Sequence, residues 1–247
     1  MIGGFPVDRY SRDENLIAYA GLSAHIGRIV DQSYAGAMIV DVKDQGVEYN
    51  ALTRGYNTSA RLLFHTDGAC LTGLMCLGVP AEGGLSVLAS SGTVHNLVLV
   101  ERPDLHAVLR CGFHHHRRGE HAPGEMPISP EPIPVFAYCD GLMHCTYDRN
   151  QALWAQEAGV VMAPEQFEAL AYMDAALSRP ELQLHMGLQL GDIQYANNFT
   201  VLHARTAYRD DARRQRHLLR IWLETAHSRW HGLTMRDLYT RRVGTVA

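Results

Sequence analysis

The chain has 247 residues, 47% of them hydrophobic, which suffices to bury one large core, so we expect a single domain over residues 1–247. Its 22 basic and 26 acidic side chains leave a net charge of −4, which argues against a nucleic acid partner. The sequence has no uninterrupted run of 18 apolar residues, so we predict no membrane span. Five cysteines without a C-x-x-C pair predict neither a disulfide framework nor a zinc ribbon, so we expect a reduced, cytoplasmic protein.

The first part of the chain predicts one helix followed by a series of strands. Ser11 and Glu14 form a capping-box pattern before a mostly apolar run, which indicates a helix over residues 12–26. Several short apolar runs follow, and turn-forming residues separate them, which is typical of consecutive strands. The predicted strands cover residues 37–42, 60–67, 71–79 and 85–91.

The middle of the chain interrupts the strands with helices and a long loop. Pro103 divides residues 93–110 into two short helical pieces, because proline interrupts a helix. Residues 111–134 have five prolines in their second half and no hydrophobic period, so they predict a loop of the kind that often serves as a lid or binding loop. The dipeptide Asp140-Gly141 predicts a tight hairpin turn.

Residues 164–178 form a further predicted helix, and residues 182–190, 193–198 and 216–224 return to the period of strands. Strands from both ends of the chain with helices between them fit a closed or sandwiched antiparallel sheet better than alternating βαβ units. We therefore predict a mainly β fold with flanking helices.

His65 and Asp67 form an H-x-D pair at the end of an apolar run. In a strand, side chains two positions apart point to the same face, so these two can converge on one point. A buried carboxylate is costly unless it is paired or bound to a metal. The pair alone also fits a capped turn with a satisfied core histidine.

A second cluster of polar residues lies near the end of the chain. His203 follows a predicted strand, and Arg216 and Arg220 share one face of the last strand with Leu218 and Trp222. Two arginines on a core-facing side need anionic partners. Two histidines and a carboxylate that leave three positions open describe the facial triad of non-haem iron(II) oxygenases, in which a 2-oxo acid and O₂ fill those positions.

The runs TSARLLFHTD, GGLSVLASS, GDIQYANNFTVLHARTAYRD and RHLLRIWL occur in this order and resemble the TauD/TfdA-type (clavaminate synthase-like) Fe(II)/2-oxoglutarate-dependent dioxygenases. The resemblance covers most of the chain. It implies a double-stranded β-helix (jelly-roll) core with a helical insertion, and Fe(II), 2-oxoglutarate and O₂ acting on a small-molecule substrate. The N-terminus is short relative to that family, so the chain is either a short variant or starts late. We expect a homo-oligomer, in which a neighbouring subunit can complete the substrate pocket.

Carried over onto this chain, the resemblance implies three iron ligands, His65, Asp67 and His203. Asn197 and Asn198 stand where relatives have polar residues next to the metal, and they either orient the ligands or satisfy a turn.

The resemblance also implies a cosubstrate site. Arg216 would bind the 5-carboxylate of 2-oxoglutarate, and Ser86, where relatives usually carry threonine, would donate a hydrogen bond to the same group. Arg214 is an alternative to Arg216, because some relatives have a shorter spacing from the histidine.

Three residues are expected on the substrate side. Arg220 matches an arginine that contacts substrate anions or the cosubstrate in relatives. Asn57 and Arg61 precede the H-x-D pair and either line the substrate cavity or are exposed polar residues of a strand. His114, His115 and His116 lie in the long loop, and they have no role in the family pattern.

The expected reaction is the oxidation, in the simplest case hydroxylation, of an unactivated C–H bond in a small polar metabolite that carries a carboxylate. 2-Oxoglutarate would be decarboxylated to succinate and CO₂. A cupin-like metal-dependent hydrolase would use the same ligands without a 2-oxo acid, and a non-catalytic β-barrel binding protein would need no iron.

Overall fold

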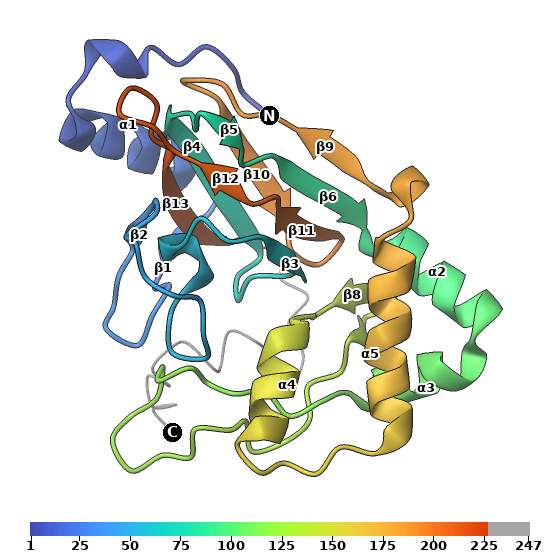
Figure 1. The fold of residues 1–247 in the computed structure, drawn as a ribbon. Coiled ribbons are helices and arrows are strands. Elements are labelled where there is room, and N and C mark those ends of the chain that lie inside the picture. The colour runs from blue at the N-terminus through green and yellow to red at the C-terminus, as the bar shows by residue number, and fades with distance from the viewer. Residues whose placement is uncertain (227–247) are drawn as a thin grey trace.

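The protein is built on two antiparallel sheets (Figure 1) in a computed structural model that describes residues 1–226. One sheet has the order β1–β13–β4–β10, with β2 also paired to β13, and the other has the order β3–β11–β6–β9. The strands of the first sheet are β1 Arg28–Val30, β2 Ile39–Val42, β4 Leu71–Gly78, β10 Ile193–Asn197 and β13 His217–Glu224. Those of the second are β3 Leu62–His65, β6 Ser86–Ser90, β9 Leu184–Met186 and β11 Val201–Arg205. The predicted mainly β architecture with a jelly-roll core is confirmed.

The alternation of side chains along β13 separates two environments. Leu219, Ile221 and Leu223 pack with Tyr19 of helix α1 in one buried cluster. Arg220, on the opposite face, lines a cavity to which both sheets contribute. The period of two read from the sequence therefore places the charged residue of this strand between the sheets.

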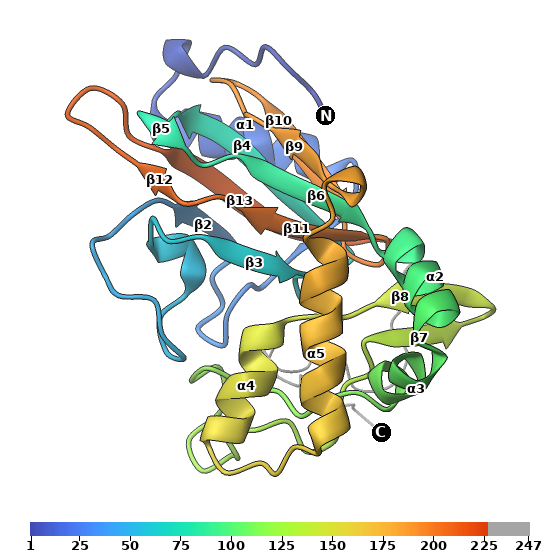
Figure 2. The ribbon, with the colours of Figure 1, turned by 45° about the vertical axis from the view of Figure 1, so that its right-hand side comes forward.

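The helices lie in two places. Helix α1 (Arg12–Ala24) begins with the expected capping box between Ser11 and Glu14 and packs on the outer face of the first sheet. The other helices gather with the β7–β8 hairpin beyond one end of the sheets (Figure 2). They are α2 Ser91–Glu101, α3 Pro103–Cys111, α4 Arg149–Glu157 and α5 Pro164–Leu177. Short 3₁₀ turns are η1 Val7–Arg9, η2 Gly55–Asn57 and η3 Pro180–Leu182.

The hairpin joins β7 (Phe136–Cys139) to β8 (Leu142–Cys145), and a two-stranded pair joins β5 (Glu82–Gly83) to β12 (Tyr208–Arg209). Asp140 and Gly141 have φ angles of 50° and 76°, as the predicted tight turn requires. Residues 112–135 contain no named strand or helix, as predicted. No helix in residues 1–226 is long and apolar enough to cross a membrane.

Two parts of the fold differ from the sequence prediction. Helix α4 was missed, because its sequence has no long apolar stripe; it starts where the Asp148 carboxylate accepts from the backbone N–H groups of Asn150 and Gln151. His203 was expected just after a strand, but it lies in the middle of β11.

Leu219 is fully buried in the first sheet, whereas Leu52 is 71% exposed. We expect Leu219→Ala to lower the free energy of unfolding by about 2–5 kcal/mol, because it removes apolar contacts and leaves a cavity. Leu52→Ala should change it by no more than about 0.5 kcal/mol. Urea unfolding measures both, and equal losses would contradict this account of the core.

Candidate metal and cosubstrate site

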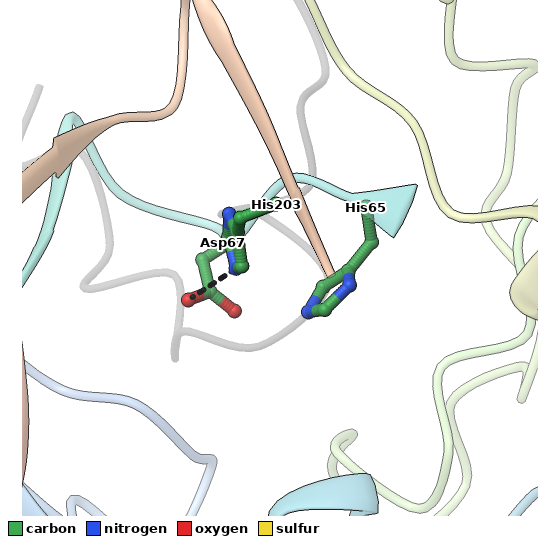
Figure 3. Close-up of side chains that lie close together, drawn as sticks. All are labelled: His65, Asp67 and His203. Carbon is green, nitrogen blue, oxygen red and sulfur yellow. Dashed lines mark ion pairs between the residues drawn. The ribbon is translucent and has the colours of Figure 1, made fainter. Parts of the chain in front are cut away.

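Strand pairing brings the three candidate metal ligands together. His65 ends β3 and His203 lies opposite it in β11 as a register partner, while Asp67 follows two residues after His65. The three side chains point toward one another (Figure 3), and their ligand atoms all lie within 4.8 Å of each other. Within residues 1–226 no other group of three or more His, Cys, Asp or Glu side chains has such a geometry.

The protonation of these residues suits a divalent metal. His65 Nδ1 lies 2.8 Å from the carbonyl oxygen of Leu63, and because a carbonyl only accepts, the proton belongs on Nδ1 and the Nε2 lone pair is available. Burial, and then the neighbouring His203, lower the pKa of His65. Two histidines and one carboxylate are a donor set that iron(II) takes in non-haem oxygenases, so the residues fit this metal.

Asp67 stays ionised although it is only 7% exposed. Burial by itself raises its pKa, but the charge of Arg220, and then the neighbouring His203, outweigh that effect and hold the pKa well below its usual range. Arg220 Nη1 lies 3.5 Å from Asp67 Oδ1, and Arg220 Nε donates to Gln32 Oε1 at 2.7 Å. A charged carboxylate in this position is ready to hold a cation.

A buried hydrogen-bond network fixes the backbone and carboxylate of Asp67. Asn198 Oδ1 accepts from the Asp67 backbone N–H at 3.1 Å, and Asn198 Nδ2 donates to Thr72 Oγ1 at 3.0 Å. Thr72 Oγ1 in turn donates to Asp67 Oδ2 at 2.6 Å. Asn197 instead accepts from the backbone N–H of Phe199. Of the two asparagines, Asn198 therefore fixes the position of Asp67 and Asn197 satisfies a turn.

Two cavities meet at this site. Five residues line both, namely Tyr56, Leu62, His65, Asp67 and Arg220. One, the inner cavity, extends between the sheets toward Arg216 and Ser86. The other, the outer cavity, is walled by the loops and by the start of α4. A metal at the triad would thus be accessible from two sides.

Arg216 is buried at the end of the cavity between the sheets. It is 4% exposed, and its Nη1 has no hydrogen-bond partner among residues 1–226. Gly84 packs against it: at this glycine, with φ of 70°, a Cβ would lie 3.1 Å from Arg216 Cδ, so the GG pair makes room for the arginine. Ser86 is also buried and lines the same cavity. An unpaired buried guanidinium indicates an anion site.

Comparison with known proteins identifies the family. The model of the taurine catabolism dioxygenase TauD, TfdA family matches residues 1–222. The chain belongs to this family. FR-33289 synthase of Streptomyces rubellomurinus is 30% identical, over 93% of this chain and 69% of that protein. Taurine hydroxylase-like protein SAT17 of Stachybotrys chartarum is 31% identical, over 90% of this chain and 59% of that protein.

Solved structures of the same fold are more distant in sequence. Asparagine oxygenase in complex with Fe(II), 3-hydroxyasparagine and succinate has a TM-score of 0.63 at 18% identity, over 81% of this chain and 61% of that one. PvcB of Pseudomonas aeruginosa has a TM-score of 0.58 at 19% identity, over 87% and 72%. This chain thus spans about three fifths of the length of SAT17 and of asparagine oxygenase.

Three residues expected in the TauD/TfdA-type site lie elsewhere. Arg214 is in the turn before β13, where its half-exposed side chain faces Asp211 at 3.5 Å and lines neither of the two cavities at the triad. Asn57 accepts a hydrogen bond from Gln45, and Arg61 is exposed; neither lines either cavity. The sequence left open whether Asn57 and Arg61 line the cavity or are exposed; in the structure η2 turns the chain before β3 begins at Leu62.

The loop walls supply residues that the sequence reading missed. Arg118, in the loop of residues 112–135, lines the outer cavity, is 9% exposed and has φ of 57°. Its Nε and Nη2 donate to the carbonyl oxygens of Ala51 and Thr53, and its guanidinium lies 4.9 Å from the ring centre of Trp154. Arg54 pairs with Glu120 at 2.6 Å in the same region. The sequence held one signal for Arg118, which is a basic residue next to a run of histidines.

The three consecutive histidines of this loop do not converge. His114 Nδ1 lies 2.8 Å from the Ser129 carbonyl, and His116 Nδ1 accepts from the Arg118 backbone N–H. His115 is 1% exposed, and burial lowers its pKa to about 4. The run therefore shapes the loop that carries Arg118, and no metal cluster forms there among the described residues.

Thr72 offers a test of the network around Asp67. We expect Thr72→Val to weaken Fe(II) binding by about 10- to 100-fold, because outer partners that orient a ligand typically contribute that much to affinity. Thr72→Ser keeps the hydroxyl and should bind like the parent. Anaerobic competition with a chromophoric chelator measures both, and an unchanged affinity in Thr72→Val would show that the network does not support the metal.

Proposed function

We propose that this protein is an Fe(II)/2-oxoglutarate-dependent dioxygenase that hydroxylates a C–H bond of a small anionic metabolite. The observation that carries the proposal is the meeting of two cavities at His65, Asp67 and His203, one of which ends at the unpaired, buried Arg216. Family membership supports the same chemistry. A cavity that ends in a cation favours an enzyme with a separate anionic cosubstrate over a metal-dependent hydrolase, which needs none.

The overall reaction consumes substrate, 2-oxoglutarate and O₂ and yields hydroxylated substrate, succinate and CO₂. When bound, the iron supplies the redox chemistry that couples the decarboxylation to the C–H oxidation. His65, Asp67 and His203 would hold the metal, and the hydrogen bonds from Thr72 and to Asn198 would keep Asp67 oriented toward it. We propose that a single domain carries these functions. Assembly into a homo-oligomer stays a prediction.

Arg216 and Ser86 would fix the direction of the cosubstrate. A guanidinium that is buried without an acidic partner gains most from a carboxylate, and the fork of donors on arginine matches the two carboxylate oxygens. With the far carboxylate of 2-oxoglutarate at Arg216, its 2-oxo acid end would point along the cavity to the triad. The shared lining of the two cavities supports this orientation.

Three arginines, Arg54, Arg118 and Arg220, line the outer cavity against two carboxylates, Asp67 and Asp148, and this excess favours an anionic substrate. Arg220 lies between the rings of Tyr56 and Trp222, at 4.6 and 5.1 Å from their centres, and it already faces Asp67. Arg118 lines the same cavity, and it has no carboxylate partner among residues 1–226. We infer that a carboxylate or similar oxyanion of the substrate lies near both arginines, with Arg118 the less neutralised of the two.

Anaerobic titration tests the activity directly. Protein loaded with Fe(II) should develop a weak visible charge-transfer band when 2-oxoglutarate is added, and turnover in air should release succinate. Asp67→Ala should lose the band, because it removes a metal ligand. A folded parent protein that shows neither band nor succinate would refute the dioxygenase proposal.

The cosubstrate assignment has a matched pair of variants. Arg216→Met should raise the dissociation constant of 2-oxoglutarate by on the order of 100-fold, because a charge-assisted pair is lost. Arg214→Met should leave it within about twofold, since that side chain is half-exposed outside the cavity. The same anaerobic titration gives both values, and the reverse order would return Arg214 to the role of cosubstrate ligand.

The substrate assignment can be tested with pairs of compounds that are identical except that one carries a carboxylic acid and the other the corresponding primary amide. We expect acids to stimulate succinate formation and amides to fail, because an amide brings no charge to the cavity. Arg118→Gln should raise the KM for a competent acid by about tenfold or more, with unchanged 2-oxoglutarate binding. Equal use of acid and amide would exclude an anion-selective pocket.

A further inference from the structure

The cavity between the sheets ends in two buried arginines rather than one. Arg205 is 5% exposed and Arg216 is 4% exposed, and both line this cavity with Ser86. Among residues 1–226, neither arginine forms an ion pair with an acidic side chain. The sequence reading assigned no role to Arg205.

The strand geometry places Arg205 on the metal-facing side of its sheet. It lies two residues after His203 in β11, so both side chains leave the same face of the strand. In the pairing of β11 with β6, Arg205 lies directly opposite Ser86. The Arg205 and Arg216 guanidinium carbons lie 4.8 and 5.2 Å from the centre of the same Tyr208 ring. The two cations therefore lie beside the same ring, and the charge of Arg216 acts on Arg205.

Only part of the Arg205 guanidinium is used by the fold. Its Nη2 donates to the carbonyl oxygens of Thr58 and Ala60. Its Nε and Nη1 are buried without a hydrogen-bond partner among the described residues, as is Arg216 Nη1. The two bonds of Nη2 tie β11 to residues 58–60, which is a structural role. They leave Nε and Nη1 without a role in the fold of the described residues.

Both guanidinium groups keep their charge at neutral pH. Burial, and then the charge of Arg216, lower the pKa of Arg205 to about 10. Two like charges buried side by side with unsatisfied donors are costly, and an anion that accepts from both removes much of that cost. A carboxylate has two oxygens with about four lone-pair sites, which is enough for the three orphaned donors and the Ser86 hydroxyl.

We propose that Arg205 is a second cosubstrate-binding arginine, which together with Arg216 and Ser86 holds the far carboxylate of 2-oxoglutarate. The inference rests on the proposed function, since it names a further residue of the same site. It adds that the carboxylate is shared between strand β11 of one sheet and the residue just before β13 of the other, so that the bound cosubstrate links the two sheets.

The test measures 2-oxoglutarate binding to anaerobic Fe(II)-loaded protein through the charge-transfer band, together with thermal unfolding with and without the cosubstrate. Arg205→Met should raise the dissociation constant on the order of 10- to 100-fold, because bonds to a charged group are lost. The stabilisation that saturating 2-oxoglutarate gives the parent should shrink at the same concentration. Arg209→Met is the matched control, because Arg209 is exposed and pairs with Glu82, and it should bind like the parent.

A purely structural role for Arg205 predicts a different pattern. Arg205→Met would then lower the melting temperature of the ligand-free protein and leave the dissociation constant within about twofold, which would overturn the inference. If Arg205→Met does not fold, Arg205→Lys decides: it retains the charge without the fork, so weakened binding supports the inference and parent-like binding rejects it.

Binding of 2-oxoglutarate by the parent and the contribution of Arg205 to that binding are tested separately. If the parent shows no 2-oxoglutarate binding at all, the proposed function fails. If the parent binds and Arg216→Met weakens binding while Arg205→Met does not, only the inference about Arg205 fails.

Discussion

The antiparallel pairing of β3 with β11 is the constraint on which the site depends. It sets His65 opposite His203, and Asp67 then follows within reach of both. Because side chains alternate along a strand, a slip of one residue in this register would turn a histidine away from its partner. The pairing shows a register shift between His203 and Arg205, so the strand is locally irregular where metal-facing and cavity-facing residues follow each other.

The charges at the triad and the charges at the far end of the inner cavity are balanced differently. At the triad, the positive charge of Arg220 is matched by Asp67, and a network through Thr72 and Asn198 satisfies the remaining groups. At the far end of the inner cavity, Arg205 and Arg216 are buried without acidic partners among residues 1–226. The first arrangement stabilises the protein as it stands, while the second is unfavourable until an anion binds, as we propose. Burial of Arg205 and Arg216 thus lowers the stability of the ligand-free protein and at the same time favours binding of an anion.

The outer cavity is built differently, because loops and helix ends supply its walls. Arg118 adopts a positive φ and is held there by two backbone carbonyls and the Trp154 ring. The buried pair of Arg54 and Glu120 joins the same loops. The two sheets therefore carry the triad and the two buried arginines of the inner cavity, and the segments between the strands shape the outer cavity. This division is typical of enzymes in which loops on a fixed scaffold set specificity.

The sequence by itself determined the elements with strong local signals: the capping box before α1, the break at Pro103, the Asp140-Gly141 turn and the alternation of β13. It also singled out His65, Asp67 and His203, because ionisable groups beside apolar runs are costly without a partner. Tertiary structure decided which arginines face the cavities. It separated Arg216 from Arg214, excluded Asn57 and Arg61, and added Arg118 and Arg205. These outcomes depend on where a strand begins, how a turn redirects the chain and which loops pack together, and such long-range contacts leave no periodic trace in a single sequence.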